Sequence, residues 1–164
     1  MKLTFERAHE LLDYDPTTGV FRWKIKRRGP RRPGEVAGTV GSHGYIAIVI
    51  DGEGWLGHRL AWFMTHGSLL DDQIDHENLI RVDNRLKNLR VATPLQNRGN
   101  VRVRSDSRTG VKGVSWHKQT QKWNAHIRIN GRKRSLGLFH SILEAGAAYA
   151  TAAQQHFGEY ARVA

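Results

Sequence analysis

The stretch from Gln73 to Asn100 gathers side chains suited to breaking a phosphodiester bond. It contains the adjacent pair Asp75-His76, followed by Asn88 and Asn97. Phosphodiester hydrolysis needs a base that activates water, and an imidazole with a pKa of roughly 6.5 serves at neutral pH. It also needs oxygen ligands for a hard cation at the phosphate, which carboxylate and amide groups supply. These residue types therefore indicate metal-assisted hydrolysis.

The chain is strongly basic, with 26 Lys and Arg against 15 Asp and Glu and a formal net charge of +11. Such an excess usually meets a polyanion, most often nucleic acid, although charge for solubility alone is the plainer alternative. Residues 1–50 carry 9 basic and 5 acidic side chains, residues 51–110 carry 9 and 8, and residues 111–164 carry 8 and 2. The nearly neutral segment with the Asp-His pair thus has basic flanks, which suits a catalytic centre between binding surfaces.

Composition narrows the class of protein. A chain of 164 residues holds one domain or two small ones. The absence of cysteine excludes disulfides and cysteine-based zinc sites, and it fits a reducing cytoplasm. The charged N-terminus does not read as a signal peptide, and the longest apolar run, residues 45–50, is too short to span a membrane.

The first half predicts alternating short helices and strands. Thr4 is placed to cap a helix, and Gly67 is placed to end another. Lys26 to Pro33 predicts an exposed basic loop, for which phosphate contact and simple solvation are equally good readings. The expected elements are a helix over 5–12, a turn over 15–19, strands over 20–25, 35–40 and 45–50, and a helix over 58–66.

The Asp-His window predicts strand, loop, strand and helix. The strands are expected over 73–76 and 89–93. Thr93-Pro94-Leu95-Gln96 has the chemistry of a helix start, which places Asn97 early in a helix. The plainer alternative is an ordinary hairpin and helix in which the asparagines form turns.

The C-terminal part predicts three antiparallel strands and one helix. Residues 101–110 are polar and basic and read as a linker. Asn130-Gly131 is a strong hairpin signal, and Ser141 with Glu144 forms a capping box. The strands are expected over 114–117, 123–129 and 133–138, with the helix running from 141 to about 157.

The window closely resembles HNH endonucleases, in the variant whose last His is replaced by Asn. The resemblance rests on Asp75-His76, on HRLAWFMTHG before it, and on NRLKNLRVAT and QNRGN after it. Together with LLDYDPTTGVFRWK near the N-terminus, it covers nearly all of residues 6–100 and is similar to phage-encoded HNH proteins related to homing endonucleases. It implies a ββα-metal fold that holds one divalent cation, in a phage-encoded protein acting in the cytoplasm of the host cell.

By this resemblance, Asp75 and Asn97 would bind the metal, Mg²⁺ or Mn²⁺, and His76 would be the general base. Asn88 would brace the loop that aims His76. Each residue also has a plainer reading, since Asp75 and Asn88 suit turn caps and Asn97 suits a helix surface. Three further residues stay open between structural, DNA-contacting and chemical roles: His58, Asn84 and Asn100.

Residues 110–163 resemble the DNA-binding domain of plant Apetala-two and ethylene-response-factor (ERF) proteins. The Gly-Val, Trp, Leu-Gly-x-Phe and Ala-rich helix elements carry the likeness. Strand alternation turns Trp123, Ala125, Ile127 and Ile129 toward the helix and leaves a polar, basic face. That face is expected to bind phosphates rather than read bases, because Lys, Ser and His replace several Arg and Trp of the plant pattern. Simple solvation is the alternative. The expected DNA-binding residues are Arg102, Arg104, Lys112, Ser115, His117, Asn124, His126, Arg128, Lys133 and Ser135.

The sequence thus predicts an α+β protein that has a ββα-metal (HNH) nuclease unit followed by a three-stranded antiparallel sheet packed on one helix. The expected domains are residues 1–100 with a nuclease core over 58–100, a linker over 101–110 and a DNA-binding domain over 111–164. The expected activity is metal-dependent cleavage of double-stranded DNA by a monomer or homodimer. The alternative is a non-catalytic DNA-binding protein or regulator derived from such a nuclease. A zinc-stabilised module is disfavoured because no cysteine is present.

Overall fold

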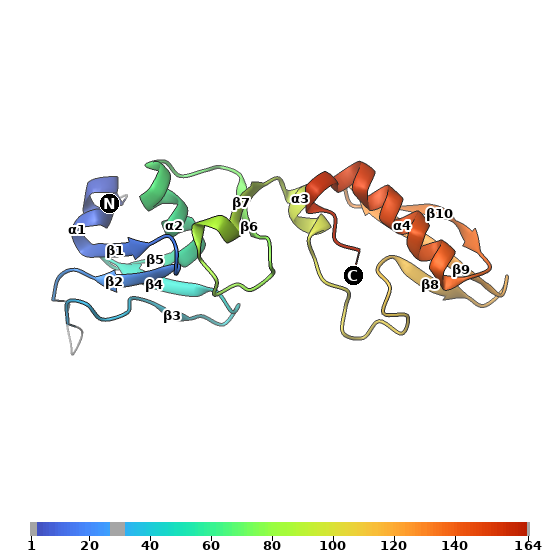
Figure 1. Ribbon diagram of the computed structural model, residues 1–164, viewed down its shortest axis with the longest axis horizontal. Coiled ribbons are helices and arrows are strands. Elements are labelled where there is room, and N and C mark those ends of the chain that lie inside the picture. Colours follow the sequence, from blue (N-terminus) through green and yellow to red (C-terminus); the bar gives the residue numbers. More distant parts are fainter. Residues whose placement is uncertain (1–2, 27–31, 164) are drawn as a thin grey trace. The chain divides into compact units, whose positions relative to one another are not determined.

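The computed structural model describes residues 3–26 and 32–163, so residues 27–31 of the expected basic loop lie outside the described residues. The chain divides into two compact units, Met1–Val91 and Ala92–Ala164, and each is described by itself. Both combine short helices with antiparallel strands (Figure 1), which confirms the expected α+β class. Within the described residues, no helix is long and apolar enough to cross a membrane.

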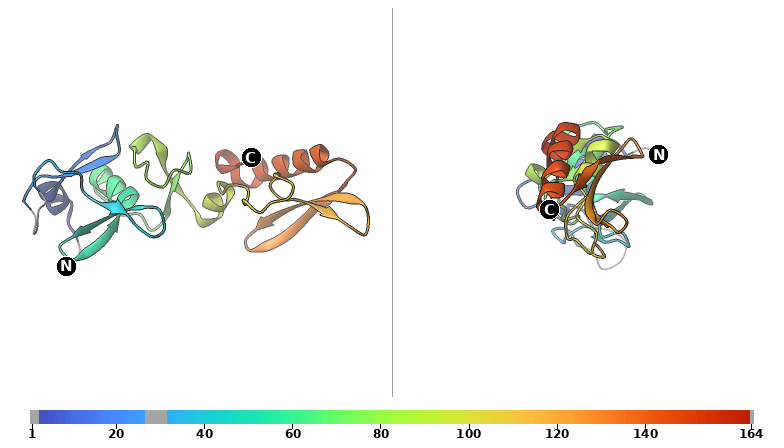
Figure 2. Two further views of the ribbon diagram at one scale, coloured as in Figure 1. Left: turned by 90° about the horizontal axis from the view of Figure 1, so that it is seen from below. Right: turned by 90° about the vertical axis from the view of Figure 1, so that its right-hand side faces the viewer.

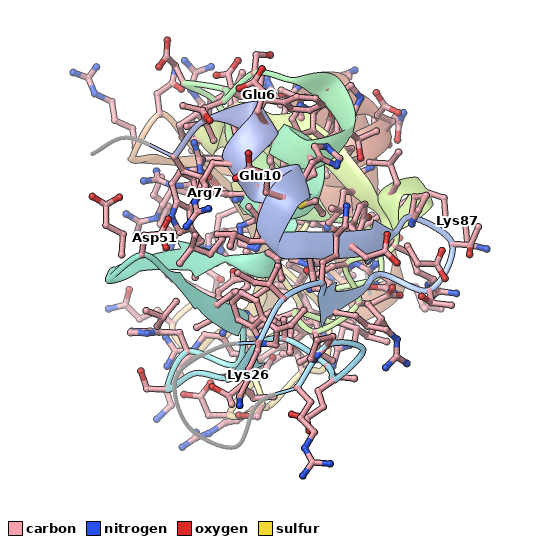
Figure 3. All side chains as sticks on the ribbon, turned by 90° about the vertical axis from the view of Figure 1, so that its left-hand side faces the viewer. Glu6, Arg7, Glu10, Lys26, Asp51 and Lys87 are labelled. Atoms are coloured by element: carbon pink, nitrogen blue, oxygen red, sulfur yellow. The ribbon has the colours of Figure 1, made fainter. Side chains whose placement is uncertain are left out.

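The first unit begins with a capped helix. Helix α1 spans Phe5–Leu11, and the Thr4 side chain accepts a hydrogen bond from the Arg7 amide at 3.1 Å. The Arg7 side chain also donates to Asp51 at 3.0 Å and to Glu10 at 3.1 Å, which ties α1 to the turn that contains Asp51 (Figure 3). The chain then forms a hairpin of β1, Leu12–Asp15, and β2, Val20–Trp23.

A three-stranded sheet and a helix complete this part of the unit. The strands are β3, Thr39–Val40, β4, Ile46–Ile50, and β5, Glu53–Leu56, in the order β3-β4-β5. Helix α2, Gly57–His66, follows and ends at Gly67, whose φ of 75° suits glycine. It packs against α1, β4 and β5. The shared core includes the fully buried side chains of Leu11, Leu12, Phe21, Ile48 and Leu60.

The Asp-His window has the expected order of elements. Strand β6, Gln73–His76, pairs with β7, Leu89–Ala92, and a short 3₁₀ helix η1, Leu86–Asn88, precedes β7. Helix α3, Pro94–Gly99, follows a complete capping box between Thr93 and Gln96. Helix α3 belongs to the second unit, where it packs against helix α4, Ile142–Phe157, and the short 3₁₀ helix η2, Gly158–Tyr160.

The second unit is a sheet covered by one helix. Strands β8, Val114–His117, β9, Lys122–Ile129, and β10, Arg132–Phe139, run in the order β10-β9-β8. Asn130-Gly131 forms the turn of the β9–β10 hairpin, with positive φ at both residues. Helix α4, Ile142–Phe157, lies along one face (Figure 2) and leads into η2, Gly158–Tyr160. This arrangement confirms the expected sheet and helix.

Small side chains let the helix approach the sheet closely. Ala145 and Ala153 of α4 and Ala125 of β9 are fully buried, and Ile127 and Tyr149 are nearly so. The sheet face that carries Ala125 and Ile127 therefore forms the core of this unit. Its opposite face is left to the polar side chains of β9 and β10.

Candidate active site

His76 is the last residue of β6 and is only 5% exposed. Its Nε2 lies 3.3 Å from the side-chain oxygen Oδ1 of Asn84. Burial lowers the pKa of His76, and the hydrogen bond that its ring donates to Asn84 opposes that shift. The ring is therefore neutral at neutral pH, which is the form in which an imidazole accepts a proton.

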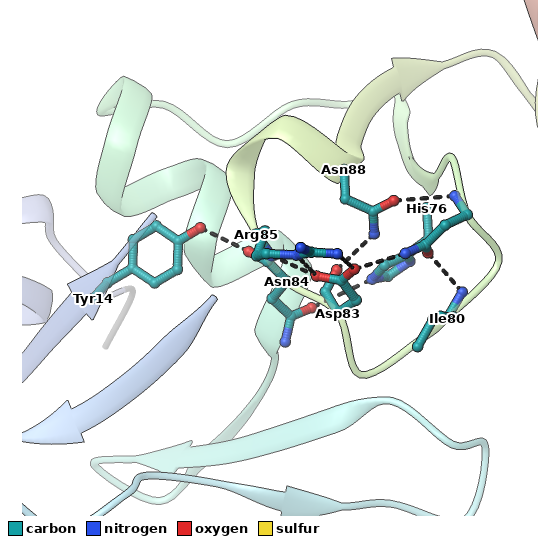
Figure 4. A network of polar contacts seen from close by, with 8 residues as sticks. Tyr14, His76, Ile80, Asp83, Asn84, Arg85 and Asn88 are labelled. Atoms are coloured by element: carbon teal, nitrogen blue, oxygen red, sulfur yellow. Dashed lines mark hydrogen bonds and ion pairs between the residues drawn. The ribbon is translucent and has the colours of Figure 1, made fainter. Parts of the chain in front are cut away.

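The loop after β6 is held by a network of side-chain bonds around Asp83 (Figure 4). Asn88 donates from Nδ2 to the backbone carbonyl of Asp83 at 2.8 Å. Its Oδ1 accepts from the backbone N–H of Asn78 at 3.0 Å. The Asp83 carboxylate accepts from Arg85 Nε at 2.7 Å and from Asn78 Nδ2 at 2.6 Å. The Arg85 guanidinium lowers the pKa of Asp83 to about 2, so the carboxylate stays ionised. The network fixes the loop that faces His76.

Asn84 is the most deeply buried polar residue of this loop, at 1% exposure. The Tyr14 hydroxyl from β1 donates to its carbonyl at 2.7 Å. Its side chain contacts His76, whereas the Asn88 side chain bonds the loop backbone. The structure therefore brings Asn84 and His76 into direct contact.

His58 of α2 stands edge-on to His76, with ring centroids 5.0 Å apart. Tyr45 lies beside both rings, 5.0 Å from His58 and 5.8 Å from His76, and the Arg81 guanidinium lies over Tyr45. Burial, and then the nearness of His76 and Arg59, lowers the pKa of His58 to about 4. His58 is thus an uncharged side chain that lies against His76. No sequence pattern pointed to Tyr45 or Arg81. Their positions beside the two histidines result from packing between segments that are far apart in the chain.

Asp75 is 4% exposed and forms an ion pair with Arg90 on the paired strand β7. Arg90 Nη2 lies 3.0 Å and Nε 3.1 Å from the same oxygen, Oδ2. Sequence reasoning missed Arg90, although a basic residue on the partner strand was the available signal. Asn97 lies on α3 in the second unit and is partly buried.

Asp75 and Asn97 offer the oxygen ligands that a hard cation prefers, so the donor types fit Mg²⁺ or Mn²⁺. Among residues 3–26 and 32–163, no group of three or more His, Cys, Asp or Glu side chains is placed to hold a metal ion. Asn100 is the other asparagine whose role the sequence left undecided. It is 3% exposed, and its Oδ1 accepts a hydrogen bond from Arg162 Nε at 3.1 Å.

Replacing Arg90 with leucine is expected to destabilise the protein by about 3 kcal/mol, because it removes the Arg90 charge that pairs with the buried Asp75 carboxylate. Urea unfolding at neutral pH measures the change. Arg7→Ala is the matched control, since its ion pair with Asp51 is exposed, and it is expected to have a much smaller effect. Equal losses in the two variants would contradict the importance of the buried pair.

Acid is expected to destabilise the first unit through His58. Its pKa falls from 6.5 to about 4 on folding, so the unfolded chain takes up the proton first as the pH drops through this window. The loss reaches about 2 kcal/mol near pH 5. Urea unfolding followed through NMR signals of α2 measures it. His58→Leu is expected to flatten the change between about pH 7.5 and 5, whereas His43→Gln, at an exposed position, leaves it intact. An unchanged slope in His58→Leu would exclude this origin.

The expected DNA-binding residues of the second unit fall into two groups. Arg128, Lys133, Ser115 and Ser135 are exposed, and the register pairs Arg128 with Lys133 and His126 with Ser135 on the face away from α4. Asn124, His126 and His117 share that face but are partly buried.

The remaining three lie along the segment before β8. Lys112 donates to the carbonyls of Gly99 at 2.8 Å and Val101 at 2.7 Å, and burial lowers its pKa to about 8. Arg104 pairs with Asp106, and Arg102 is exposed. A pocket of about 540 Å³ brings together five of the expected binding residues, namely Arg102, Arg104, Lys112, His126 and Arg128.

Comparison with known proteins defines the class. Residues 56–98, from the end of β5 into α3, match the HNH endonuclease family. The matched range contains His58, Asp75, His76, Asn88 and Asn97. These residues therefore lie in an HNH endonuclease domain.

This chain is similar to a phage protein over most of the length of that protein. Protein 3.8 of Escherichia phage T7 is 31% identical over 107 residues, which cover 64% of this chain and 87% of that protein. The chain therefore belongs to the family of this phage protein. Among solved structures, the HNH homing endonuclease I-HmuI, from a study of its DNA binding and cleavage, aligns with 96% of this chain and 84% of its own at 19% identity and a TM-score of 0.42.

Proposed function

We propose that the protein is a metal-dependent DNA endonuclease in which His76 is the general base. The observation that carries the proposal is the buried, neutral His76 in contact with Asn84 inside an HNH endonuclease domain. A neutral imidazole at the end of β6 would be in the form that takes a proton from an attacking water. The alternative, a non-catalytic DNA-binding protein of the same family, is distinguished by experiment.

The other residues of the domain would support His76. Asn88 braces the loop through its bonds to Asp83 and Asn78, and Asp75 and Asn97 would bind the divalent cation. When bound, such a cation offsets negative charge on the phosphate and on the departing 3′ oxygen. Arg90 pairs with the Asp75 carboxylate and orients it, and Asp75 would give up part of that contact on binding the cation.

The second unit would hold double-stranded DNA, as its resemblance to Apetala-two and ERF domains implies. The support is charge: residues 111–164 carry 8 basic and 2 acidic side chains, and Arg128 and Lys133 are exposed on the sheet face away from α4. Phosphate contacts position a protein without selecting a sequence. A single catalytic centre cuts one strand, so a monomer would nick and a double-strand break would need two subunits. We place this activity in the cytoplasm of the phage-infected cell.

Incubation with supercoiled plasmid in Mg²⁺, Mn²⁺ or EDTA tests the proposal. The expected result is conversion to the open-circular form with either metal and none with EDTA. Retarded but uncut plasmid in all three would establish the non-catalytic alternative and overturn the nuclease.

A further inference from the structure

The contact between Asn84 and His76 fixes where the imidazole proton sits. Asn84 Oδ1 lies 3.3 Å from His76 Nε2, and an amide oxygen only accepts hydrogen bonds. The hydrogen of the neutral ring is therefore on Nε2, and the lone pair that takes up a proton is on Nδ1. A side chain that fixes the tautomer also fixes which ring nitrogen can accept a proton.

Burial of the Asn84 side chain leaves one of its polar atoms without a hydrogen bond within the described part of the chain, which is unfavourable. The side chain is 1% exposed, and its Nδ2 is a buried atom without a hydrogen-bond partner among the described residues. An apolar side chain of the same shape would avoid this unpaired amide nitrogen, so packing alone does not favour asparagine here. The atom that the amide contributes is Oδ1, and its contact is His76.

Two glycines from distant segments make room for Asn84. A side-chain carbon added at Gly57 would lie 2.7 Å from Asn84 Nδ2, and one added at Gly19 would lie 2.6 Å from its carbonyl carbon. Gly57 is the first residue of α2 and has no positive φ, so alanine there would suit the helix better. Ile46 Cβ would also lie 3.1 Å away, but the Asn84 amide is the nearest obstacle and the main reason for glycine at this position.

We propose that Asn84 is a positioning residue that holds His76 as its Nε2–H tautomer, and that Gly57 is glycine in order to admit the Asn84 amide. The inference deepens the proposed nuclease and rests on it for its catalytic consequence. The loop network around Asp83 and Asn88 places the Asn84 backbone, and the Tyr14 hydroxyl anchors the Asn84 carbonyl. The Asn84 side chain then sets the ring.

The tautomer is measured in the metal-free full-length protein by long-range ¹H–¹⁵N NMR of the imidazoles, with the His76 signals assigned from a His76→Gln spectrum. The wild type is expected to show a single Nε2–H tautomer. Asn84→Asp keeps an acceptor of the same shape and is expected to preserve it. Asn84→Leu keeps the volume without an acceptor and is expected to lose the uniform tautomer.

Cleavage kinetics give the catalytic consequence. Asn84→Leu is expected to lower kcat by roughly 100-fold, a typical worth of a well-placed base, with KM for DNA unchanged, while Asn84→Asp retains most of kcat. Gly57→Ala, which displaces the amide, is expected to lower kcat in the same way. Gly54→Ala is the matched control, because a side-chain carbon there meets nothing within 4 Å, and it is expected to match the wild type.

Two results would overturn the inference: an Nδ1–H tautomer in the wild type, or identical tautomers and kcat in Asn84→Leu and Asn84→Asp. Thermal unfolding identifies a variant that fails to fold, and Gly57→Ala then supplies the displaced amide by a second route. The NMR result does not depend on cleavage. A wild type that shows the Asn84-dependent tautomer but cuts no DNA would sink the nuclease and leave the contact standing, so the two failures are distinguishable.

Discussion

Replacing His76 with alanine is expected to abolish Mg²⁺-dependent nicking of plasmid while DNA affinity stays within a few-fold of the wild type. Loss of a positioned general base removes a factor of roughly 10² to 10⁴ in rate, which takes nicking below detection in an ordinary assay. Affinity should persist because His76 is 5% exposed and uncharged, so it offers little attraction to phosphates. Nicking time courses and fluorescence-anisotropy titrations, run on one preparation, measure both quantities.

His66→Ala is the matched control for this variant. His66 is exposed at the end of α2, in the same unit and in the same matched family range, and its ring stacks on Trp62. It is expected to nick at the wild-type rate. Retained cleavage by His76→Ala would remove His76 as the base, and a parallel loss of binding would assign it to DNA contact instead.

Neutralising Arg128 and Lys133 together is expected to weaken DNA binding at low salt by at least about tenfold and to make it less sensitive to salt. Each lost phosphate contact lowers the slope of log affinity against log salt by about 0.9, so the double variant should lose about 2. The two side chains face each other across the β9–β10 hairpin and are exposed. Anisotropy titrations between roughly 50 and 200 mM salt measure the slope.

The same strand supplies a control of equal charge. Arg132 and Arg134 flank Lys133 and pair with Ile129 and Ile127, so strand alternation places them on the opposite face. Neutralising both removes two positive charges from β10 and is expected to change the slope much less. Equal slopes for the two double variants would show that overall charge, rather than the proposed face, binds DNA.

The elements that sequence predicted well are those whose signals are local. Thr93 with Gln96 and Ser141 with Glu144 form complete capping boxes, and Asn130-Gly131 forms the hairpin turn, because each signal spans only a few residues. Strands β1 and β5 were missed. Glu53–Leu56 contains a glycine and a glutamate and becomes a strand through pairing with β4, which no local pattern encodes.

The candidate site likewise combines residues that the sequence identified with partners that it did not. Residue types and spacing singled out Asp75 and His76, but the partners of these residues come from pairing and packing. Arg90 reaches Asp75 because β6 and β7 pair. Asn84 reaches His76 because Tyr14 anchors its backbone and Gly57 leaves room for its side chain, both from distant parts of the chain. Sequence left Asn84 open because an asparagine in a loop is most often a turn former.

The chemistry of the cut ends tests the central claim most directly. Plasmid nicked by the wild type in Mg²⁺ is labelled for free 5′-phosphate and 3′-hydroxyl ends, with the His76→Ala protein and EDTA as blanks. Water attack with departure of the 3′ oxygen predicts nicks that carry a 5′-phosphate and a 3′-hydroxyl, present only with wild-type protein and metal. The same number of nicks in the His76→Ala sample, or ends of another kind, would contradict a hydrolytic centre built on His76.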